Sequence, residues 1–423
     1  MKRIVTVVLA AVLALGGAWA QDANKPVTVS FMCTARPKTD QKDFYLDILP
    51  QLVKEKYPNI TVTVDTLPTD QYKSAIKSRL AAEEGPDIFT WWAFGLIDQL
   101  AKADYVRDLS DLSFVKSMSP SLLKGFTVDG SIKAVPRGTT FLCVYYNRTL
   151  FAKAGIKALP ADWPSFLADC KKLKDAGIAP IVAADKDWVH IQYMLYAAAS
   201  SVLYRDDVDY DAKVISGKAK LTDPKWIEII NKMKTLYDDG YIAKGSLGIG
   251  GEQAFQIFND GQAAMKIDGT WDIGNLTKKG AVDFERGTFS LPTNDAGKSL
   301  IMPFSIDSGL AVNKFTKNYD AVKKILEYWY QDGSPLNKAF KASFTPAPPV
   351  FGGVSVLPLF ADYLGPRKAA QTQYFCNAYW PDGVAQELCV KFQEYIAGMA
   401  KAQDVAAAAE RKLREIQAQT AGN

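Results

Sequence analysis

Apolar and polar positions alternate with two different periods near the start of the chain. Residues 27–32 and 60–64 alternate apolar and polar side chains, a pattern typical of β-strands. Apolar residues recur at helical spacing over 44–53 and 72–82, and a short apolar run over 88–92 follows. The order strand, helix, strand, helix, strand predicts an α/β fold with a parallel sheet and right-handed crossovers.

The same two periods continue through the rest of the chain after an irregular segment at 134–138. Breaks at glycine and proline separate the later elements from one another. These elements are expected to be a strand over 141–146, helices over 163–176 and from Pro224 onward, a strand over 263–267 that leads to Gly269-Thr270-Trp271, and a C-terminal helix with its apolar stripe over 405–416.

The chain has 423 residues, which is more than one hydrophobic core normally supports, so two domains are expected. We expect the chain to cross between them near 134–138, 305–309 and 345–349. The predicted division is an N-terminal lobe of residues 21–136 plus 306–342 and a C-terminal lobe of residues 137–305 plus 343–423.

Residues 1–20 have the features of a signal peptide. Lys2 and Arg3 form a basic start, an apolar run extends to Leu15, and Ala18-Trp19-Ala20 is a small-x-small cleavage site. No cysteine follows that site directly, and no later segment is apolar for long enough to span a bilayer. We therefore expect a free periplasmic monomer with no direct membrane insertion.

Positive and negative charges are nearly balanced. There are 50 Lys and Arg against 46 Asp and Glu, and loss of Lys2 and Arg3 would lower the net charge from +4 to +2. This balance argues against nucleic acid or an anionic membrane as the main partner. The five cysteines form no C-x-x-C motif and no Cys/His cluster, so neither a metal nor a cofactor is predicted. Cys376 and Cys389 could form a disulfide bond in an oxidising compartment.

Trp91 and Trp92 end the third predicted strand. In an open α/β sheet, the loops that leave the carboxyl ends of the strands carry the ligand-binding groups. An indole offers a large apolar face and one N–H donor, which suits a ligand such as a sugar ring. The alternative is that one of the two indoles belongs to the core.

Several short motifs follow one another along the chain: Tyr57-Pro58, Gly85-Pro86-Asp87-Ile88, Ala134-Val135-Pro136, Tyr146-Asn147-Arg148, Leu150-Phe151 to Gly155-Ile156, Trp163 with Phe166, Phe258-Asn259-Asp260-Gly261 to Ala264-Met265, and Gly269-Thr270-Trp271. In this order, the chain resembles the extracellular solute-binding proteins of ABC-type sugar importers, the family 1 group that includes maltose-binding protein. Each motif is weak alone, but together they span nearly the whole mature chain.

The resemblance implies a two-lobed periplasmic-binding-protein fold in which each lobe is a mostly parallel sheet flanked by helices. A hinge of several segments would join the lobes and close around a sugar or oligosaccharide held in the cleft between them. The loaded protein would then dock on a membrane permease, whose ATPase partner supplies the energy. Phe94-Gly95 stands where charged residues follow the first Trp in the maltose type, which implies a different sugar.

The resemblance also implies ligand-binding roles for tryptophans in both lobes. Trp91 matches the family's Trp after the Pro-Asp element, and Trp92 extends that platform. Trp271 matches a second aromatic residue that would press on the ligand from the other lobe. Trp380, which follows Tyr379 in a late loop, is a further stacking candidate.

Four more residues are candidates for ligand binding. Trp188 and His190 lie where the family commonly places a binding aromatic, although a lone histidine is more often structural. Arg36 follows the first strand, and its guanidinium could bridge two hydroxyl groups, whereas the alternative is an exposed surface arginine. Asp307 lies at an expected hinge segment and could accept protons from two sugar hydroxyls, or it could simply cap a turn.

Two other classes of function stay open. A carbohydrate-active enzyme would need two facing carboxylates or an activated nucleophile, but acidic neighbours such as Glu83-Glu84 diverge and no G-x-S-x-G motif occurs. An exported protein for a non-sugar ligand, such as a polyamine, a peptide or an acidic sugar, would share the fold.

Overall fold

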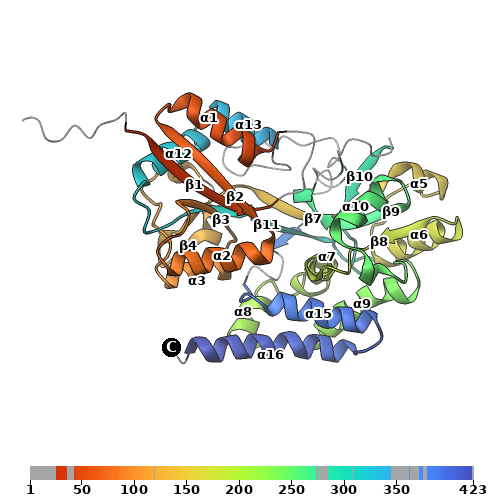
Figure 1. The fold of residues 1–423 in the computed structure, drawn as a ribbon. Helices are drawn as coiled ribbons and strands as arrows, with labels where there is room; N and C mark the ends of the chain where they lie inside the picture. The colour runs from red at the N-terminus through yellow and green to blue at the C-terminus, as the bar shows by residue number, and fades with distance from the viewer. Residues whose placement is uncertain are drawn as a thin grey trace, which may run out of the picture.

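The computed structural model describes residues 25–35, 42–118, 120–272, 276, 284–306, 308–343, 362, 371–374 and 379–421. The predicted signal peptide and the predicted crossing at 345–349 lie outside these residues. Two β-sheets organise the described chain, each covered by helices, which confirms the predicted two-lobed α/β fold (Figure 1).

The first sheet has the strand order β2-β1-β3-β12-β6. Its strands β1, β2 and β3 are parallel, whereas β12 pairs antiparallel with both β3 and β6. The bounds of these strands are Val27–Thr34 for β1, Ile60–Leu67 for β2, Ile88–Trp91 for β3, Ala134–Pro136 for β6 and Gly309–Val312 for β12; a separate hairpin joins β4, Thr127–Val128, to β5, Ser131–Ile132.

The second sheet has the order β13-β11-β7-β9-β8, and β10 also pairs with β7. The pairs β8–β9 and β11–β13 are parallel, and the three pairings of β7 are antiparallel. The strands are β7 Thr139–Asn147, β8 Ala179–Val182, β9 Ala263–Gly269, β10 Arg286–Phe289, β11 Ile301–Ile306 and β13 Gln371–Tyr374.

Helices cover both faces of the first sheet, because side chains on successive strand residues point to opposite faces. On β1, Phe31 packs against the cluster that includes residues of α1, α12 and α13, whereas Met32 packs against the cluster of α2 and α3. Figure 1 shows these two groups of helices on opposite sides of β1, β2 and β3. The helices are α1 Leu49–Lys56, α2 Thr69–Ala81, α3 Gly95–Lys102, α4 Pro120–Leu123, α12 Tyr319–Tyr330 and α13 Pro335–Ser343, with short turns η1 Phe44–Ile48, η2 Ser113–Ser117 and η3 Lys124–Phe126.

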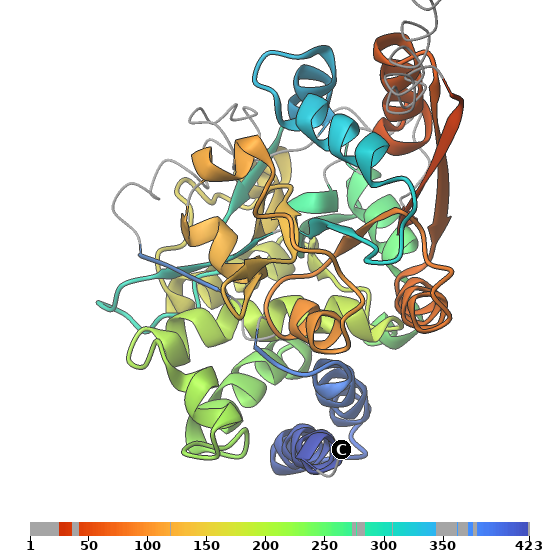
Figure 2. The ribbon, with the colours of Figure 1, turned by 90° about the vertical axis from the view of Figure 1, so that its left-hand side faces the viewer.

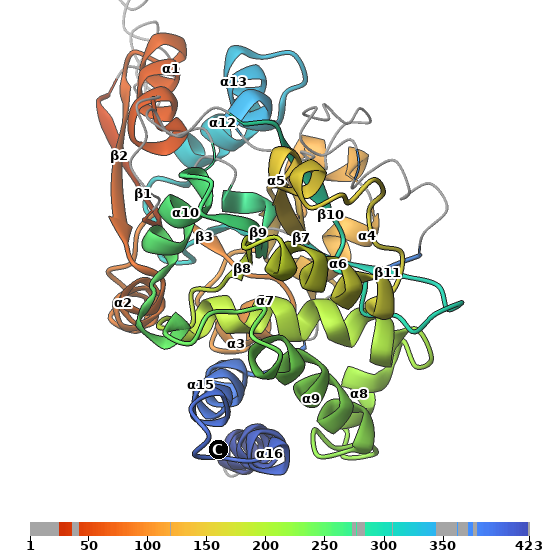
Figure 3. The same cartoon turned by 90° about the vertical axis from the view of Figure 1, so that its right-hand side faces the viewer.

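The second sheet is covered in the same way. Leu142 on β7 joins the large cluster under α6, α7, α9, α15 and α16, whereas Phe141 joins a smaller cluster with α10. Figure 3 shows α15 and α16 as the outermost layer beneath α7 and α9. The helices are α5 Arg148–Lys153, α6 Trp163–Asp175, α7 Trp188–Ala199, α8 Tyr210–Ile215, α9 Pro224–Asp238, α10 Gly251–Asn259, α15 Val384–Ile396 and α16 Ala402–Ala421, with short turns η4 Ser200–Tyr204, η5 Ser246–Gly248 and η6 Thr270–Asp272.

The predicted helix over 44–53 is divided into two parts. Residues 44–48 form one wide π-helical turn, η1, and α1 begins at Leu49. Pro50 has no N–H group, so it fits the first turn of a helix but not its interior. The helix therefore starts where proline is tolerated, and the wider turn joins it to the chain before it.

The chain passes directly between the two sheets at two adjacent places. β6 of the first sheet ends at Pro136 and β7 of the second begins at Thr139, while β11 ends at Ile306 and β12 begins at Gly309. These direct passages carry no crossover helix, which is why both sheets are mixed: each passage continues as an antiparallel strand in the next sheet.

A buried arginine ties the two passages together. Arg137 donates from its backbone N–H and its Nε to the Ser308 carbonyl oxygen at 3.3 and 3.2 Å, and its guanidinium also contacts the hydroxyls of Ser308 and Tyr45. The two passages are thus tied to each other at this point. Among the described residues, none of the helices is both long enough and apolar enough to cross a membrane.

Candidate functional site

The strand directions define where a ligand site is expected in each lobe. In the first lobe, the carboxyl ends of β2 and β3 lead to α2 and to the turn before α3. In the second, the parallel strands β8 and β9 lead to α7 and η6. These two carboxyl edges are where an open α/β sheet binds its ligands.

Trp271 lies at the carboxyl end of β9 and is 36% exposed. It is the only aromatic residue among the exposed large apolar side chains of the described chain. Its indole lies over Gly269, where an added Cβ would be only 2.1 Å from the ring. The Tyr193 ring meets the indole edge-on at a centroid distance of 5.2 Å. The glycine therefore lets the indole lie flat against the strand end.

His190 belongs to the same group of side chains. Its ring meets Tyr193 edge-on at 5.5 Å, and its Nδ1 is 3.4 Å from the Asp268 carboxylate. Trp188 begins the same helix, α7, and is half-buried against the core of the lobe. The structure thus joins His190 and Trp271 through Tyr193, and it places Trp188 on the same helix. We refer to Trp271, Tyr193 and His190 as the aromatic platform.

A buried ion pair supports the aromatic platform from below. Asp268 and Lys266 are both fully buried on β9 and form a salt bridge, and the second Asp268 oxygen accepts the Gly269 N–H at 2.7 Å. Burial alone would raise the pKa of the Asp268 carboxyl, but the Lys266 ammonium and the His190 side chain outweigh that effect and hold the pKa well below its usual value. Asp268 is therefore a compensated anion that fixes the turn before Trp271.

Sequence reasoning did not find Lys266, Asp268 or Tyr193 as part of the site. The available signal was the pair of charges two residues apart within an apolar strand, because such residues share one face. Within the described residues, no group of three or more histidine, cysteine, aspartate or glutamate side chains is arranged to hold a metal ion.

The two adjacent tryptophans of the first lobe lie in different environments. Trp91 is fully buried, and its Nε1 donates to the Leu96 carbonyl oxygen at 3.0 Å. It packs with Tyr72 on the α2 and α3 side of the sheet, so its position is at odds with direct stacking on a ligand. Trp92 follows the last strand residue and is only half-buried, with the Lys73 Nζ 5.2 Å from the ring centroid. Trp92 is therefore the more exposed of the two indoles.

Trp380 is a core residue as well. It is 2% exposed, packs on Trp226 at 5.5 Å, and donates from Nε1 to the Asp211 carboxylate at 3.2 Å. This burial is at odds with the predicted stacking role. The residue that faces the first lobe is Tyr379, whose half-buried ring lies 5.0 Å from that of Phe94.

The environment of Asp211 is unusual for a carboxyl group. It is 4% exposed and accepts the Tyr204 hydroxyl at 2.6 Å as well as the Trp380 N–H. Burial raises its pKa to about 7, although the two donors act in the opposite direction. The group therefore titrates near neutral pH in the folded protein.

Three residues that the sequence analysis singled out, Arg36, Asp307 and Cys376, are not among the described residues. The roles of Arg36 and Asp307 therefore stay predictions. Cys389 is a free and fully buried thiol. Cys376, its possible disulfide partner, is outside the described residues.

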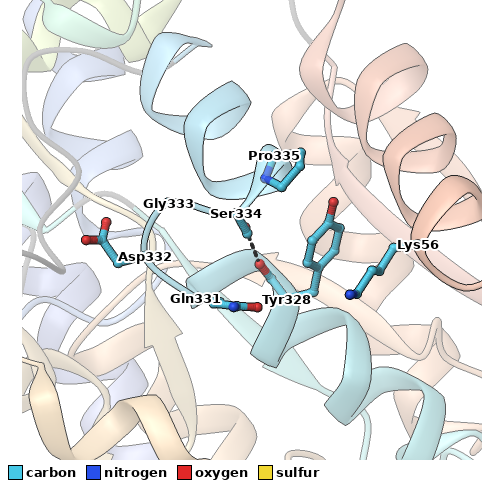
Figure 4. A pocket seen from close by; sticks show the side chains of 7 residues that line it. All are labelled: Lys56, Tyr328, Gln331, Asp332, Gly333, Ser334 and Pro335. Atoms are coloured by element: carbon cyan, nitrogen blue, oxygen red, sulfur yellow. Dashed lines mark hydrogen bonds between the residues drawn. The ribbon is translucent and has the colours of Figure 1, made fainter.

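A hollow of about 370 Å³ lies on the first lobe (Figure 4). It is formed by the end of α1 and the turn between α12 and α13, and the Ser334 hydroxyl donates to the Tyr328 carbonyl oxygen within it. None of the predicted ligand-binding residues lines it, and it lies within one lobe. The lining residues are Lys56, Tyr328, Gln331, Asp332, Gly333, Ser334 and Pro335.

The chain thus has two lobes, each built on one sheet, and it carries aromatic side chains at the carboxyl edges of both sheets. This arrangement is that of a ligand-binding protein with two lobes. Residues 39–334 match the family described as bacterial extracellular solute-binding proteins, so the chain belongs to that family. It is therefore a binding protein rather than an enzyme.

Individual relatives agree with this assignment. The multiple sugar-binding protein of Streptococcus mutans is 22% identical over 311 residues, which cover 68% of this chain and 71% of that protein. The diacetylchitobiose binding protein DasA of Streptomyces coelicolor is 25% identical over 316 residues, 73% of this chain and 70% of that protein.

Solved structures show the same fold. A chitin oligosaccharide binding protein superposes with a TM-score of 0.79 at 22% identity and covers 92% of this chain and 98% of its own. RafE in complex with raffinose superposes with a TM-score of 0.74 at 20% identity, with coverages of 91% and 99%.

Proposed function

We propose that this protein binds a sugar or oligosaccharide between its two lobes and delivers it to the permease of an ABC-type importer. The observation that carries the proposal is the exposed Trp271 indole at the carboxyl edge of the second sheet, with Tyr193 and His190 beside it. An exposed indole face suits the apolar C–H face of a sugar ring. Trp92 at the carboxyl edge of the first sheet is the partner on the other side.

The charge distribution at the aromatic platform favours a neutral ligand. The Asp268 carboxylate is fully buried and paired with Lys266, so it does not offer a free negative charge to a ligand. A polyamine would be favoured by several uncompensated carboxylates in the site. The names of the relatives in S. mutans and S. coelicolor point in the same direction, towards carbohydrates.

We also propose the predicted boundaries of the two lobes and a periplasmic location. The lobes comprise residues 21–136 plus 306–342 and residues 137–305 plus 343–423, and the direct passages β6 to β7 and β11 to β12 support two of the crossings. Residues 1–20 would direct export to the periplasm, where the protein would meet its permease and ATPase partners.

A thermal-shift screen of the mature chain against neutral mono- and oligosaccharides, acidic sugars, polyamines and peptides tests the proposal. Binding to the folded state alone raises the melting temperature as ligand concentration exceeds Kd. We expect at least one neutral saccharide to raise it in a concentration-dependent manner. A rise with a polyamine, a peptide or an acidic sugar and with no neutral saccharide would replace the proposed ligand class.

A further inference from the structure

The segment 379–383 joins the cores of the two lobes at a place separate from the β-strand passages. Trp380 is anchored in the second lobe by Trp226 and by Asp211. Tyr379 packs on Phe94 of the first lobe. Gly95, the first residue of α3, lies so close to this segment that an added Cβ would be 3.3 Å from the Tyr379 carbonyl oxygen.

An ion-pair cluster completes this contact. The two Asp382 carboxylate oxygens each accept from a different ammonium of α2, Lys73 at 2.9 Å and Lys77 at 2.9 Å. The side chains of Asp382 and Lys73 are 30% and 17% exposed, so water screens their attraction less than that of a surface pair. All three figures place α15, which begins directly after this segment, beneath α2 and α3 (Figures 1, 2 and 3).

The cluster lies at the ligand-binding edge of the first sheet. Lys73 is in the N-terminal half of α2, directly after the carboxyl end of β2, and its ammonium also lies over the Trp92 ring. Opening the lobes about the passages from β6 to β7 and from β11 to β12 would move α2 relative to the second lobe. The Asp382 contact joins α2 of the first lobe to the segment that leads into α15 of the second lobe, so it must weaken when the two lobes move apart at this place.

We propose that Asp382, Lys73 and Lys77 form a latch that holds the two lobes together and sets how tightly the ligand is retained. The proposal rests on the proposed function, because retention presupposes a ligand between the lobes. The three side chains act as positioning residues: Lys73 also fixes the Trp92 ring. A protein that is already biased towards the joined arrangement binds its ligand more tightly than one that must be closed by the ligand.

Small-angle X-ray scattering of the ligand-free mature chain tests the latch directly. Asp382→Asn should increase the radius of gyration relative to the wild type, and Asp382→Lys should increase it further, since the lysine repels Lys73 and Lys77. Combining Asp382→Lys with Lys77→Asp exchanges the two charges, so the radius of gyration should return towards the wild-type value. Asp332→Asn is the matched control, because Asp332 pairs with Lys341 at 2.7 Å within one lobe.

Ligand affinity provides the second readout. For a saccharide found in the thermal-shift screen, Asp382→Asn should raise Kd about two- to fivefold, the range of one ion pair near the surface. In a Lys73→Met, Lys77→Met background, the same substitution should have little effect, as a double-mutant cycle requires. High salt should reduce the difference between the wild type and Asp382→Asn.

The two readouts separate failure of the latch from failure of the proposed function. An unchanged radius of gyration in Asp382→Asn and Asp382→Lys, with native circular dichroism, would overturn the latch whatever the ligand is. If Asp382 variants do not fold, the Lys73→Met, Lys77→Met double variant replaces them, because it removes both ammonium partners of Asp382; an unchanged radius of gyration there has the same meaning. An expanded ligand-free Asp382→Asn that binds no saccharide would support the latch and count against the sugar.

Discussion

Trp91 and Trp92 show how far a single residue can be interpreted from sequence. Two adjacent indoles at a strand end predict that at least one of them is available to a ligand, and Trp92 is half-buried while Trp91 is fully buried. The sequence favoured Trp91 because of its match to a family motif. Strand alternation decides otherwise: Phe89 and Trp91 share the face covered by α2 and α3.

Trp91 is therefore expected to contribute to stability. Trp91→Ala should lower the free energy of unfolding by about 3–5 kcal/mol, because it leaves a cavity beside Tyr72 and removes the hydrogen bond to Leu96. Urea denaturation followed by circular dichroism measures this. A loss below about 1 kcal/mol would show that the site collapses around the smaller side chain or that the indole is not packed as described.

The raised pKa of Asp211 predicts how the stability of the protein depends on pH. Its pKa is about 7 in the folded protein, whereas an unfolded aspartate has a pKa of about 4, so the folded state holds more protons between these values. Wild-type stability should therefore fall as pH rises from about 4 to about 7, and this loss is complete above pH 7.

Asp211→Asn removes that proton exchange. The amide oxygen can accept the Trp380 N–H, and the amide N–H can donate to the Tyr204 hydroxyl oxygen. Relative to the wild type, the variant should gain stability between pH 5 and pH 8, by on the order of 1–4 kcal/mol. Urea midpoints measured across this range provide the comparison. Stability curves of the two proteins that run parallel from pH 5 to pH 8 would contradict the raised pKa.

At the scale of elements, the periodicity of the sequence predicted the β-α-β-α-β start of the chain and the helix that begins at Pro224. It did not predict the antiparallel strands β6, β11 and β12, because a short passage between sheets has no periodic signature of its own. The strand predicted over 263–267 extends to Gly269. Asp268 can lie in the buried part of this strand because its carboxylate forms an ion pair with Lys266. Sequence patterns treat such a charge as exposed.

The end of β9 can be tested through Gly269. Gly269→Ala places a Cβ where the Trp271 indole lies, so the indole must move while the strand is kept. We expect about a tenfold or larger rise in Kd for a bound saccharide, since one aromatic contact contributes about 0.5–1.5 kcal/mol beyond burial. Gly248→Ala is the matched control, because nothing lies within 4 Å of its added Cβ. Equal affinities in the two variants would show that the position of Trp271 does not matter.

At the scale of the whole molecule, the resemblance predicted a two-lobed fold that the structure and the family match both show. The contacts that join the lobes were beyond prediction. Lys73 and Asp382 are 309 residues apart in the sequence, and no local pattern pairs them. The aromatic platform was predicted in part: Trp271 and His190 lie within it, whereas Tyr193 emerged only from packing. Arg36 and Asp307 stay predictions.

The central claim is that a saccharide binds against the Trp271 indole between the lobes, and calorimetric titration of the mature protein and of Trp271→Ala with the same saccharide tests it most directly. Trp271 is exposed, so its removal should leave folding intact and weaken binding by about 1–3 kcal/mol, a five- to more than hundredfold rise in Kd. Equal affinity of Trp271→Ala and the wild type for that saccharide would contradict the claim.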